Sequence, residues 1–435
     1  MITQSARKLA QKHHLEGGRA IVVGAGKSGV AAARLLHALG AKVRMVDANE
    51  ALAPQVTAEV ERYAELQTGP HSSEQFTDAD IIVLSPGVPA KKLTPYFKGV
   101  PGRKIVAELE FASWFIDAPI IAITGSNGKT TTTTLIGELL EKSDRHVFVG
   151  GNIGTPLCEY LMDMEQADVI VLEVSSFQLQ NCRQFKPDVA VFLNIAPNHL
   201  DYHEDMEEYL EAKLRLFARQ TPDDLAVVHE SLKPVIGGRP FTEAEVVWYS
   251  SAKRFDAPHL PGEHNRANVQ AAWRAVQRFG VKPQQAERII SEFRPLENRL
   301  ENIGQADGVT FVNDSKATTL EAVAAAVKSF GSSPVRLLMG GKFKGGDVAE
   351  LARRMEGHVA QVGLYGGSRD IFEGPLKKYF PVSWDESMEA AAKRLFAHSH
   401  AGDVILLSPG TSSFDQYPNY KERGDDFKRI FGELK

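Results

Sequence analysis

Hydrophobic and polar positions alternate in blocks along this chain in a way that predicts an α/β protein. Short continuous apolar runs are each followed by a polar turn, and several of these turns lead into segments with helical spacing of apolar residues. Continuous apolar runs are typical of strands that are buried on both faces of a parallel sheet. The continuous runs that we interpret in this way are residues 20–23, 81–84, 120–123, 169–172, 189–193 and 404–407. Residues 43–46, 310–312 and 335–339, which each include one polar residue, are also predicted to be strands.

The sequence TGSNGKT, residues 124–130, lies between the apolar run 120–123 and a segment with helical spacing. A strand, a glycine loop, Lys-Thr and a helix together make a cradle for phosphate, because glycines let backbone N–H groups approach an anion. In such a loop Lys129 reaches the terminal phosphates and the Thr130 hydroxyl binds Mg²⁺. Ile123 stands where the longer form of this loop has glycine, so the predicted loop is a shortened phosphate loop.

The first part of the chain has a second glycine pattern, with Gly24, Gly26 and Gly29 between the apolar run 20–23 and a helical pattern. Together with Asp47 at the end of the next run, this fits a dinucleotide fingerprint. Taken alone it suggests an NAD-binding domain, although any diphosphate can bind at the start of such a helix. The turn SPGVP, residues 85–89, ends another apolar run and is expected at the same crevice.

Two further groups are candidates for the metal site of the central part. Glu173 follows a buried run, and a carboxylate at the end of a strand beside a phosphate loop is placed to bind a metal ion. His199 follows the next run, but Mg²⁺ prefers oxygen ligands, so a histidine that is hydrogen-bonded in a loop is the alternative. Lys213 lies on an amphipathic helical pattern, residues 209–220, and composition alone predicts a solvated side chain.

The last third of the chain has three apolar runs that end in loops rich in Lys, Thr and Ser, at residues 313–319, 340–347 and 408–415. One such loop is ordinary turn chemistry, but three together predict a site for an anionic ligand. Asn268 precedes an alanine-rich helical segment, where it either caps backbone donors or presents its amide to a base or phosphate.

Length and composition set the limits of these predictions. A chain of 435 residues suits about three domains. The net charge of −5 argues against nucleic-acid binding driven by electrostatics. No apolar run approaches the roughly 18 residues of a membrane helix. Because Cys158 and Cys182 form no CxxC pair, we expect buried thiols in a cytoplasmic protein. We also expect a monomer without nucleic-acid or membrane partners.

With these motifs placed, nearly the whole chain resembles the Mur ligase family of cell-wall biosynthesis. The segments TGSNGKTT, GGNIG, EVSSFQL, NHLD, YLEAK, HNRAN, NRLE, NDSKAT and LLSPGTSSFDQ occur in the order of that family. The resemblance implies an α/β fold with a Rossmann-like N-terminal domain (1–107), a central P-loop mononucleotide-binding domain (108–295) and a Rossmann-like C-terminal domain (296–435). NDSKAT and SSFDQ point to a member that adds D-glutamate to UDP-N-acetylmuramoyl-L-alanine.

The resemblance also implies the activity and the site residues. The reaction is amide-bond formation in peptidoglycan precursor synthesis, with ATP and Mg²⁺, through an acyl phosphate that yields ADP and phosphate. Lys129, His199 and Lys213 are the implied catalytic residues. ATP is assigned to Gly125, Ser126, Asn127, Gly128, Lys129, Thr130, Thr131, Asn268, Arg299 and Asp314. Metal is assigned to Thr130, Glu173, His199 and Lys213, with Lys213 carbamylated and so an oxygen ligand. The UDP substrate is assigned to Lys27, Ser28, Ser85, Gly87 and Asn152. D-Glutamate is assigned to Lys316, Thr318, Lys344, Ser413, Phe414 and Tyr420.

Three other functions are weighed against this one. A folate polyglutamate synthase shares the phosphate loop but lacks a leading nucleotide-binding domain, and an NAD-dependent dehydrogenase leaves the phosphate loop without a role. A non-catalytic nucleotide-binding regulator does not need Lys129, Glu173, His199 and Lys213 together. L-Glutamate as the amino acid stays open, because its exclusion depends on the shape of the pocket.

Overall fold

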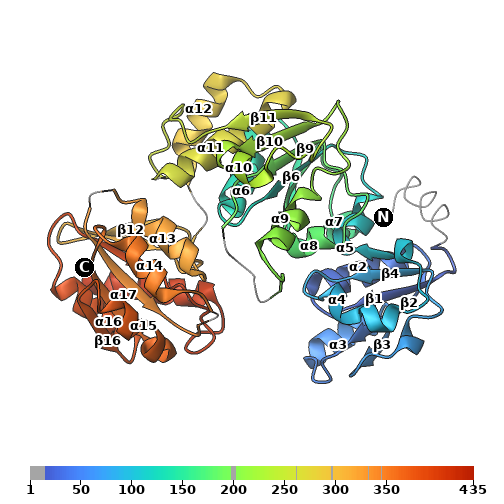
Figure 1. Cartoon of the computed structure of the whole chain (residues 1–435), viewed down its shortest axis with the longest axis horizontal. Helices are drawn as coiled ribbons and strands as arrows, with labels where there is room; N and C mark the ends of the chain where they lie inside the picture. Colours follow the sequence, from blue (N-terminus) through green and yellow to red (C-terminus); the bar gives the residue numbers. More distant parts are fainter. Residues whose placement is uncertain (1–14, 197–201, 261, 295–296, 332, 344) are drawn as a thin grey trace. The chain divides into compact units, whose positions relative to one another are not determined.

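The structure is a computed structural model that describes residues 15–196, 202–260, 262–294, 297–331, 333–343 and 345–435. Within these residues the chain forms three successive β-sheets, which are almost entirely parallel and are joined by helices (Figure 1). The predicted α/β architecture is confirmed. Each buried strand has apolar side chains on both faces, as the continuous apolar runs indicate.

The first sheet has the strand order β3-β2-β1-β4-β5, with all neighbouring strands parallel. Successive side chains of β1 belong to different apolar clusters. Ala20 and Val22 pack in one cluster, and Ile21 and Val23 pack in the other. The sheet is therefore covered on both faces. Its elements are β1 (Arg19–Val23), α2 (Lys27–Ala38), β2 (Lys42–Asp47), α3 (Pro54–Val60), β3 (Glu65–Thr68), β4 (Ile81–Leu84), α4 (Ala90–Leu93), the 3₁₀ turn η2 (Thr94–Phe97), β5 (Ile105–Ala107) and α5 (Glu108–Ser113).

The central sheet has the parallel order β11-β10-β9-β6-β8-β7. Strand β6 thus lies between β8 and β9, which places the phosphate loop beside the ends of both neighbours. The strands are β6 (Ile120–Thr124), β7 (Val147–Gly151), β8 (Val169–Glu173), β9 (Val189–Phe192), β10 (Leu225–His229) and β11 (Glu245–Tyr249). The helices are α6 (Lys129–Glu141), α7 (Leu157–Asp163), α8 (Ser176–Gln180), α9 (Met206–Leu214), α10 (Lys233–Ile236), α11 (Glu263–Val276) and α12 (Pro283–Glu292).

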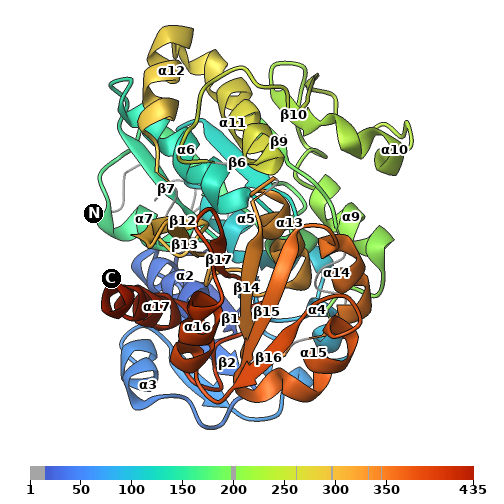
Figure 2. The same ribbon diagram turned by 90° about the vertical axis from the view of Figure 1, so that its left-hand side faces the viewer.

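The third sheet has the order β12-β13-β17-β14-β15-β16, in which only the β12–β13 pair is antiparallel among the described strands. Helices α16 and α17 lie on one side of this sheet and α14 and α15 on the other (Figure 2). The strands are β12 (Glu301–Ala306), β13 (Val309–Asn313), β14 (Val335–Gly340), β15 (Val359–Tyr365), β16 (Val382–Asp385) and β17 (Val404–Leu407). The helices are α13 (Leu320–Lys328), α14 (Val348–Met355), α15 (Arg369–Leu376), α16 (Met388–Ala397) and α17 (Tyr420–Leu434).

The chain packs into two compact units, and the first two sheets share one of them. The second unit holds the third sheet and also takes residues of the segment 251–270, whereas residues 271–286 return to the first unit. Two hydrogen bonds join that returning segment to the end of α6. Arg145 Nη2 donates to the Phe279 carbonyl (3.2 Å), and Gln285 Nε2 donates to the Lys142 carbonyl (2.8 Å).

Two helices differ from their predicted bounds. The helix expected over residues 209–220 ends at Leu214, and the chain continues in i→i+3 turns, such as the Leu216 amide to the Lys213 carbonyl (3.1 Å). The helix expected after Asn268 begins at Glu263, so Asn268 lies inside α11 and does not cap it. In the part of the chain that the structure describes, no helix combines the length and apolar character needed to cross a bilayer.

Candidate active site

The phosphate loop leaves β6 with a backbone that requires glycine at two positions. Gly125 has φ +153°, and a Cβ there would lie 3.0 Å from Leu193 Cβ. Gly128, with φ 82°, takes the left-handed conformation directly before the first residue of α6. These glycines bring the free amides of the α6 N-terminus to the end of the sheet, where they favour an anion.

Two side chains hold this loop in shape. Asn194, which follows β9, accepts the Asn127 amide at its Oδ1 (2.9 Å) and donates from its Nδ2 to the Asn127 carbonyl (3.0 Å). Lys129 Nζ donates to the carbonyls of Gly125 and Ser126, both at 2.9 Å. The ammonium group therefore lies over the loop, where a bound phosphate would replace these carbonyls as its partner. The sequence motifs give Asn194 no role, although its position directly after a strand at this edge is a signal for one.

A buried oxygen cluster stands beside the loop. The Thr130 hydroxyl donates to Glu173 Oε2 (2.6 Å), and Asn152 Nδ2 donates to Glu173 Oε1 (2.7 Å). Only 3% of Glu173 and 4% of Thr130 is exposed. The structure thus brings together three of the predicted residues, from β8, α6 and the loop after β7. His199 lies outside the described residues.

Lys213 is buried, which corrects the solvated side chain that composition alone predicts. Only 1% of it is exposed, and its Nζ donates to the Gly125 carbonyl (3.0 Å) and lies 4.5 Å from the Tyr209 ring centroid. Burial, and then the nearby charge of Lys129, lower the pKa of Lys213 well below its ordinary value, and Glu173 opposes this shift. The spacing of apolar residues in this helix does not predict the burial of Lys213, because its face of α9 packs on residues that are distant in sequence, such as Gly125.

The edge of the first sheet carries the residues expected for the UDP substrate. Asp47 accepts the Ala25 amide at 2.7 Å and the Asn49 amide at 2.8 Å, so this acid fixes the glycine loop itself. Buried Ser85 packs against Gly24, where a Cβ would lie 3.0 Å from Ser85 Cβ. Partly buried Ser28 lies on α2, and exposed Gly87 lies in the turn after β4.

Lys27, in the first turn of α2, connects this edge to the loop that carries Asn152. Its Nζ donates to the Gly154 carbonyl (2.9 Å) and lies 3.6 Å from a carboxylate oxygen of Glu159 on α7. The side chain is 62% exposed, so it remains accessible to a ligand. The predicted diphosphate and metal groups thus lie on neighbouring segments of one compact unit.

In the second unit, Asp314 is a buried acid at the end of β13. Its carboxylate accepts the Ser408 hydroxyl (2.9 Å) and the Leu300 amide (3.3 Å). Burial raises the pKa of Asp314 to about 7, against the opposing effects of these hydrogen bonds and of the Arg299 charge. Asn268, 4% exposed, donates from Nδ2 to Asn265 Oδ1 (3.1 Å).

The predicted glutamate residues lie at one edge of the third sheet, because β17 runs between β13 and β14. Lys316 Nζ lies 4.0 Å from the Tyr420 ring centroid. Thr318 is partly buried in the same loop as Lys316. Ser413 is 3% exposed and Phe414 is 69% exposed. Lys344 lies outside the described residues.

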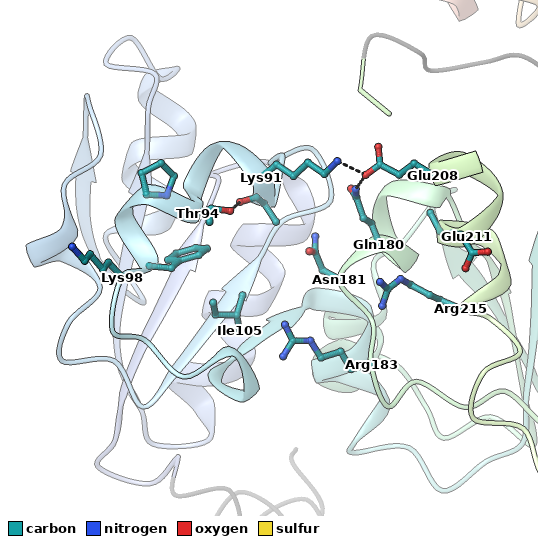
Figure 3. Close-up of a pocket in the computed structure, with 14 residues that line it drawn as sticks. Lys91, Thr94, Lys98, Ile105, Gln180, Asn181, Arg183, Glu208, Glu211 and Arg215 are labelled. Atoms are coloured by element: carbon teal, nitrogen blue, oxygen red, sulfur yellow. Dashed lines mark hydrogen bonds and ion pairs between the residues drawn. The ribbon is translucent and has the colours of Figure 1, made fainter. Parts of the chain in front are cut away.

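A cavity of about 690 Å³ lies elsewhere in the first unit. It is lined by α4, η2 and the start of β5 on one side and by α8 and α9 on the other (Figure 3). Lys91 of α4 forms ion pairs with Glu204 (2.8 Å) and Glu208 (2.7 Å) at its rim. None of the described residues predicted for the active site lines it.

Comparison with known families matches three models in order along the chain. Residues 18–98 match the Mur ligase MurD-like N-terminal domain, residues 123–257 the Mur ligase middle domain, and residues 298–410 the Mur ligase glutamate ligase domain. Two curated relatives are both named UDP-N-acetylmuramoylalanine–D-glutamate ligase. The protein of Oleidesulfovibrio alaskensis is 49% identical, covering 95% of this chain and 93% of its own length. The protein of Desulfovibrio desulfuricans is 47% identical, covering 96% and 97%.

The fold also matches a solved structure of low sequence identity. The MurF ligase of Thermotoga maritima in complex with ADP aligns with a TM-score of 0.61 at 17% identity, over 90% of this chain and 95% of that chain. At such identity the match concerns the fold alone. The relatives, which extend over almost the full length, carry the assignment: the chain belongs to the Mur ligase family.

Proposed function

We propose that this protein is the ligase that joins D-glutamate to UDP-N-acetylmuramoyl-L-alanine at the expense of ATP, in peptidoglycan precursor synthesis. The observation that carries the proposal is the cluster of Lys129, Thr130, Glu173 and Lys213 around one phosphate loop. The names of the relatives support the substrates. We assign UDP binding to residues 1–107, ATP to 108–295 and the amino acid to 296–435, in a cytoplasmic monomer.

The first half of the reaction is assigned to the central sheet. The amides at the start of α6 and the Lys129 ammonium stabilise the transferred phosphoryl group, whose charge spreads over its oxygens in the transition state. The substrate carboxylate attacks the γ-phosphate, giving an acyl phosphate and ADP. The Lys129 ammonium is held at the loop by the two carbonyls that accept its hydrogen bonds. It would therefore move little when phosphate oxygens replace these carbonyls as its acceptors.

The oxygen cluster fits Mg²⁺. Within the described residues no group of three or more His, Cys, Asp and Glu side chains is arranged to hold a metal ion. Mg²⁺ is nevertheless commonly held by one or two carboxylates together with phosphate oxygens and water, and Thr130 and Glu173 offer a hydroxyl and a carboxylate at one point. Bound there, Mg²⁺ would neutralise charge on the phosphates.

Lys213 is suited to carbamylation, because CO₂ adds only to a neutral amine. Its lowered pKa increases the fraction of neutral amine, and the product carries a carboxylate. That carboxylate would be attracted by the charge of Lys129. We therefore propose that carbamylated Lys213 supplies oxygens to the metal site, together with His199.

The second half of the reaction is assigned to the third sheet. Lys316 and the polar loops after β13, β14 and β17 would bind the carboxylates of D-glutamate, whose amine attacks the acyl phosphate. Phosphate then leaves from the tetrahedral intermediate. Positively charged groups such as Lys129 and Lys316 are needed, because the reactants together carry many negative charges.

One assay tests the proposal. ADP release is measured with ATP, Mg²⁺ and UDP-N-acetylmuramoyl-L-alanine, in separate reactions with D-glutamate, with L-glutamate and without amino acid, and NAD binding is titrated in parallel. We expect turnover with D-glutamate and none with L-glutamate. Turnover with neither enantiomer, or tight binding of NAD, would contradict the proposed function.

A further inference from the structure

Arg423 is a fully buried arginine that connects three loops of the third sheet. It lies in the first turn of α17 and is 0% exposed. Nε donates to Ser315 Oγ (2.9 Å), and Nη2 donates to the carbonyls of Ser315 (2.8 Å) and Thr411 (3.2 Å). Nη1 donates to the Gly340 carbonyl (3.4 Å). Ser315 follows β13, Thr411 follows β17 and Gly340 is the last residue of β14. One guanidinium therefore joins the ends of three adjacent strands.

The backbone of a neighbouring loop approaches Arg423 closely. Gly341 has φ +126°, and a Cβ there would lie 3.1 Å from Arg423 Nη1 and 2.3 Å from the Ser412 carbonyl. Ser315 Oγ also donates to the Tyr420 carbonyl (2.8 Å). The serine hydroxyl therefore links Arg423 to the residue whose ring lies under the Lys316 ammonium.

The guanidinium forms no ion pair with any carboxylate of the described residues. Among the described residues, its hydrogen-bond acceptors are serine and carbonyl oxygens, and no carboxylate pairs with it. Asp426, one turn further along α17, is instead bonded by the Tyr417 hydroxyl (2.7 Å) and Arg429 Nε (2.8 Å). Arginine keeps its proton in proteins, so a positive charge that no described carboxylate pairs with lies beneath this edge of the sheet.

A buried cation that has only neutral hydrogen-bond partners is costly to fold, since its desolvation is not repaid by an ion pair. Such groups are found where binding or chemistry uses the charge. The loops that Arg423 holds are the ones that present Lys316 after β13 and Ser413 and Phe414 after β17. The charge lies behind a surface that is expected to receive a dicarboxylate.

We propose that Arg423 is the positioning residue of the amino-acid site: it fixes the three loops and adds a buried positive charge behind the carboxylate-binding surface. The inference rests on the proposed function, because it names a residue that serves the amino acid and not ATP. It acts through Ser315, Gly340 and Thr411 and does not touch the substrate.

Three variants separate charge from geometry. Arg423→Met removes both the charge and the hydrogen bonds. Arg423→Lys keeps the charge but loses the planar guanidinium that bonds to several acceptors. Ser315→Ala removes only the hydroxyl that accepts from Arg423 Nε. The matched control is Arg429→Met, on the same helix with a side chain that is 47% exposed. KM and kcat are measured for D-glutamate and for ATP. Acyl-phosphate formation without amino acid is measured separately, by trapping with hydroxylamine.

We expect Arg423→Met to raise the KM for D-glutamate roughly 10- to 100-fold, the scale of a misplaced site, with partial recovery in Arg423→Lys. Ser315→Ala should give a smaller increase, and Arg429→Met none. The trapping rate at saturating ATP should stay within about twofold of wild type, because the phosphate loop is in the other unit. The ATP KM reports on Asp314, the chain neighbour of Ser315, and should rise much less than the D-glutamate KM.

Equal losses in the ATP KM, the trapping rate and the D-glutamate KM would overturn the proposal, because they indicate a general structural defect. An unchanged D-glutamate KM in Arg423→Lys and Ser315→Ala would overturn it as well, even if Arg423→Met does not fold. Failure of the proposed function looks different: the wild-type protein itself would then show no turnover that depends on D-glutamate.

Discussion

The Thr130 hydroxyl and the Glu173 carboxylate form a 2.6 Å hydrogen bond between the first turn of α6 and the end of β8. Both groups are almost completely buried. Their contact follows from the strand order, because β8 pairs directly with β6, the strand that delivers the phosphate loop. The hydroxyl and the carboxylate that we propose as metal ligands are thereby hydrogen-bonded to each other.

Replacing Glu173 by Gln should weaken the apparent affinity for Mg²⁺ by roughly 10- to 100-fold or more, because the amide removes the negative charge while keeping the shape. The measurement is ADP release as a function of Mg²⁺ concentration. Thr130→Ser keeps the hydroxyl and should retain most of the activity, whereas Thr130→Val should not. A Mg²⁺ dependence that is the same in Glu173→Gln and wild type would exclude this carboxylate from the metal site.

Lys129→Ala should abolish acyl-phosphate formation, with a loss of roughly 3 kcal/mol or more in transition-state stabilisation. The ammonium is the cation that already lies over the loop carbonyls. Hydroxylamine trapping reports the step directly. The control is Lys142→Ala, just after α6, where an exposed lysine pairs with Glu138 and its loss should leave the rate unchanged. Normal turnover by Lys129→Ala would contradict the assignment of this loop to the ATP phosphates.

Carbamylation of Lys213 should be visible by ¹³C NMR after incubation with labelled bicarbonate. The lowered pKa favours the neutral amine, which is the form that reacts with CO₂. We expect a carbamate signal in the wild type and its loss in Lys213→Arg. Since the Lys129 charge helps to lower this pKa, Lys129→Ala should move the onset of carbamate formation to higher pH. A signal that persists in Lys213→Arg would place the carbamate on another lysine.

Asp314 should make the unliganded protein less stable as pH rises. Its folded pKa of about 7 lies above the unfolded value of about 4, so the folded state binds the extra proton between these values. The stabilisation is complete below about pH 4 and is lost as pH rises through 7, with a size on the order of 4 kcal/mol. Asp314→Asn should flatten this part of the curve.

The measurement is the urea midpoint from pH 5 to 8, compared between wild type and Asp314→Asn. The domain that unfolds must be identified by a local probe, because a chain of several domains does not unfold in a single step. Parallel curves for the two proteins would show that Asp314 titrates at its ordinary pKa.

The phosphate loop could be predicted from sequence because all its parts are contiguous: a strand, two glycines, Lys129 and a helix. The three loops of the third sheet were also accessible, since parallel strands end at a common edge. The burial of Lys213 was not, because it depends on where α9 packs. Arg423 was missed for the same reason: its acceptors Ser315, Gly340 and Thr411 come from three separate strand ends.

The start of α11 shows a different limit. The sequence favours a helix that starts after Asn268, with this residue either capping backbone donors or presenting its amide to a base or phosphate, but the helix begins five residues earlier, at Glu263. Asn265 and Asn268 then lie one turn apart and bond to each other inside the helix. Residue types that favour helix ends indicate that an end is near, and they leave its position uncertain by several residues.

The return of residues 271–286 to the first unit has a consequence for synthesis on the ribosome. The first sheet is complete once residue 107 has emerged, and it can fold early because domains tend to fold as they appear. The unit that contains it stays unfinished until a segment nearly 180 residues later is made. Until then the Lys142 carbonyl at the end of α6 lacks the hydrogen bond that Gln285 donates to it, and a chain stalled before this point holds the first unit without its last segment.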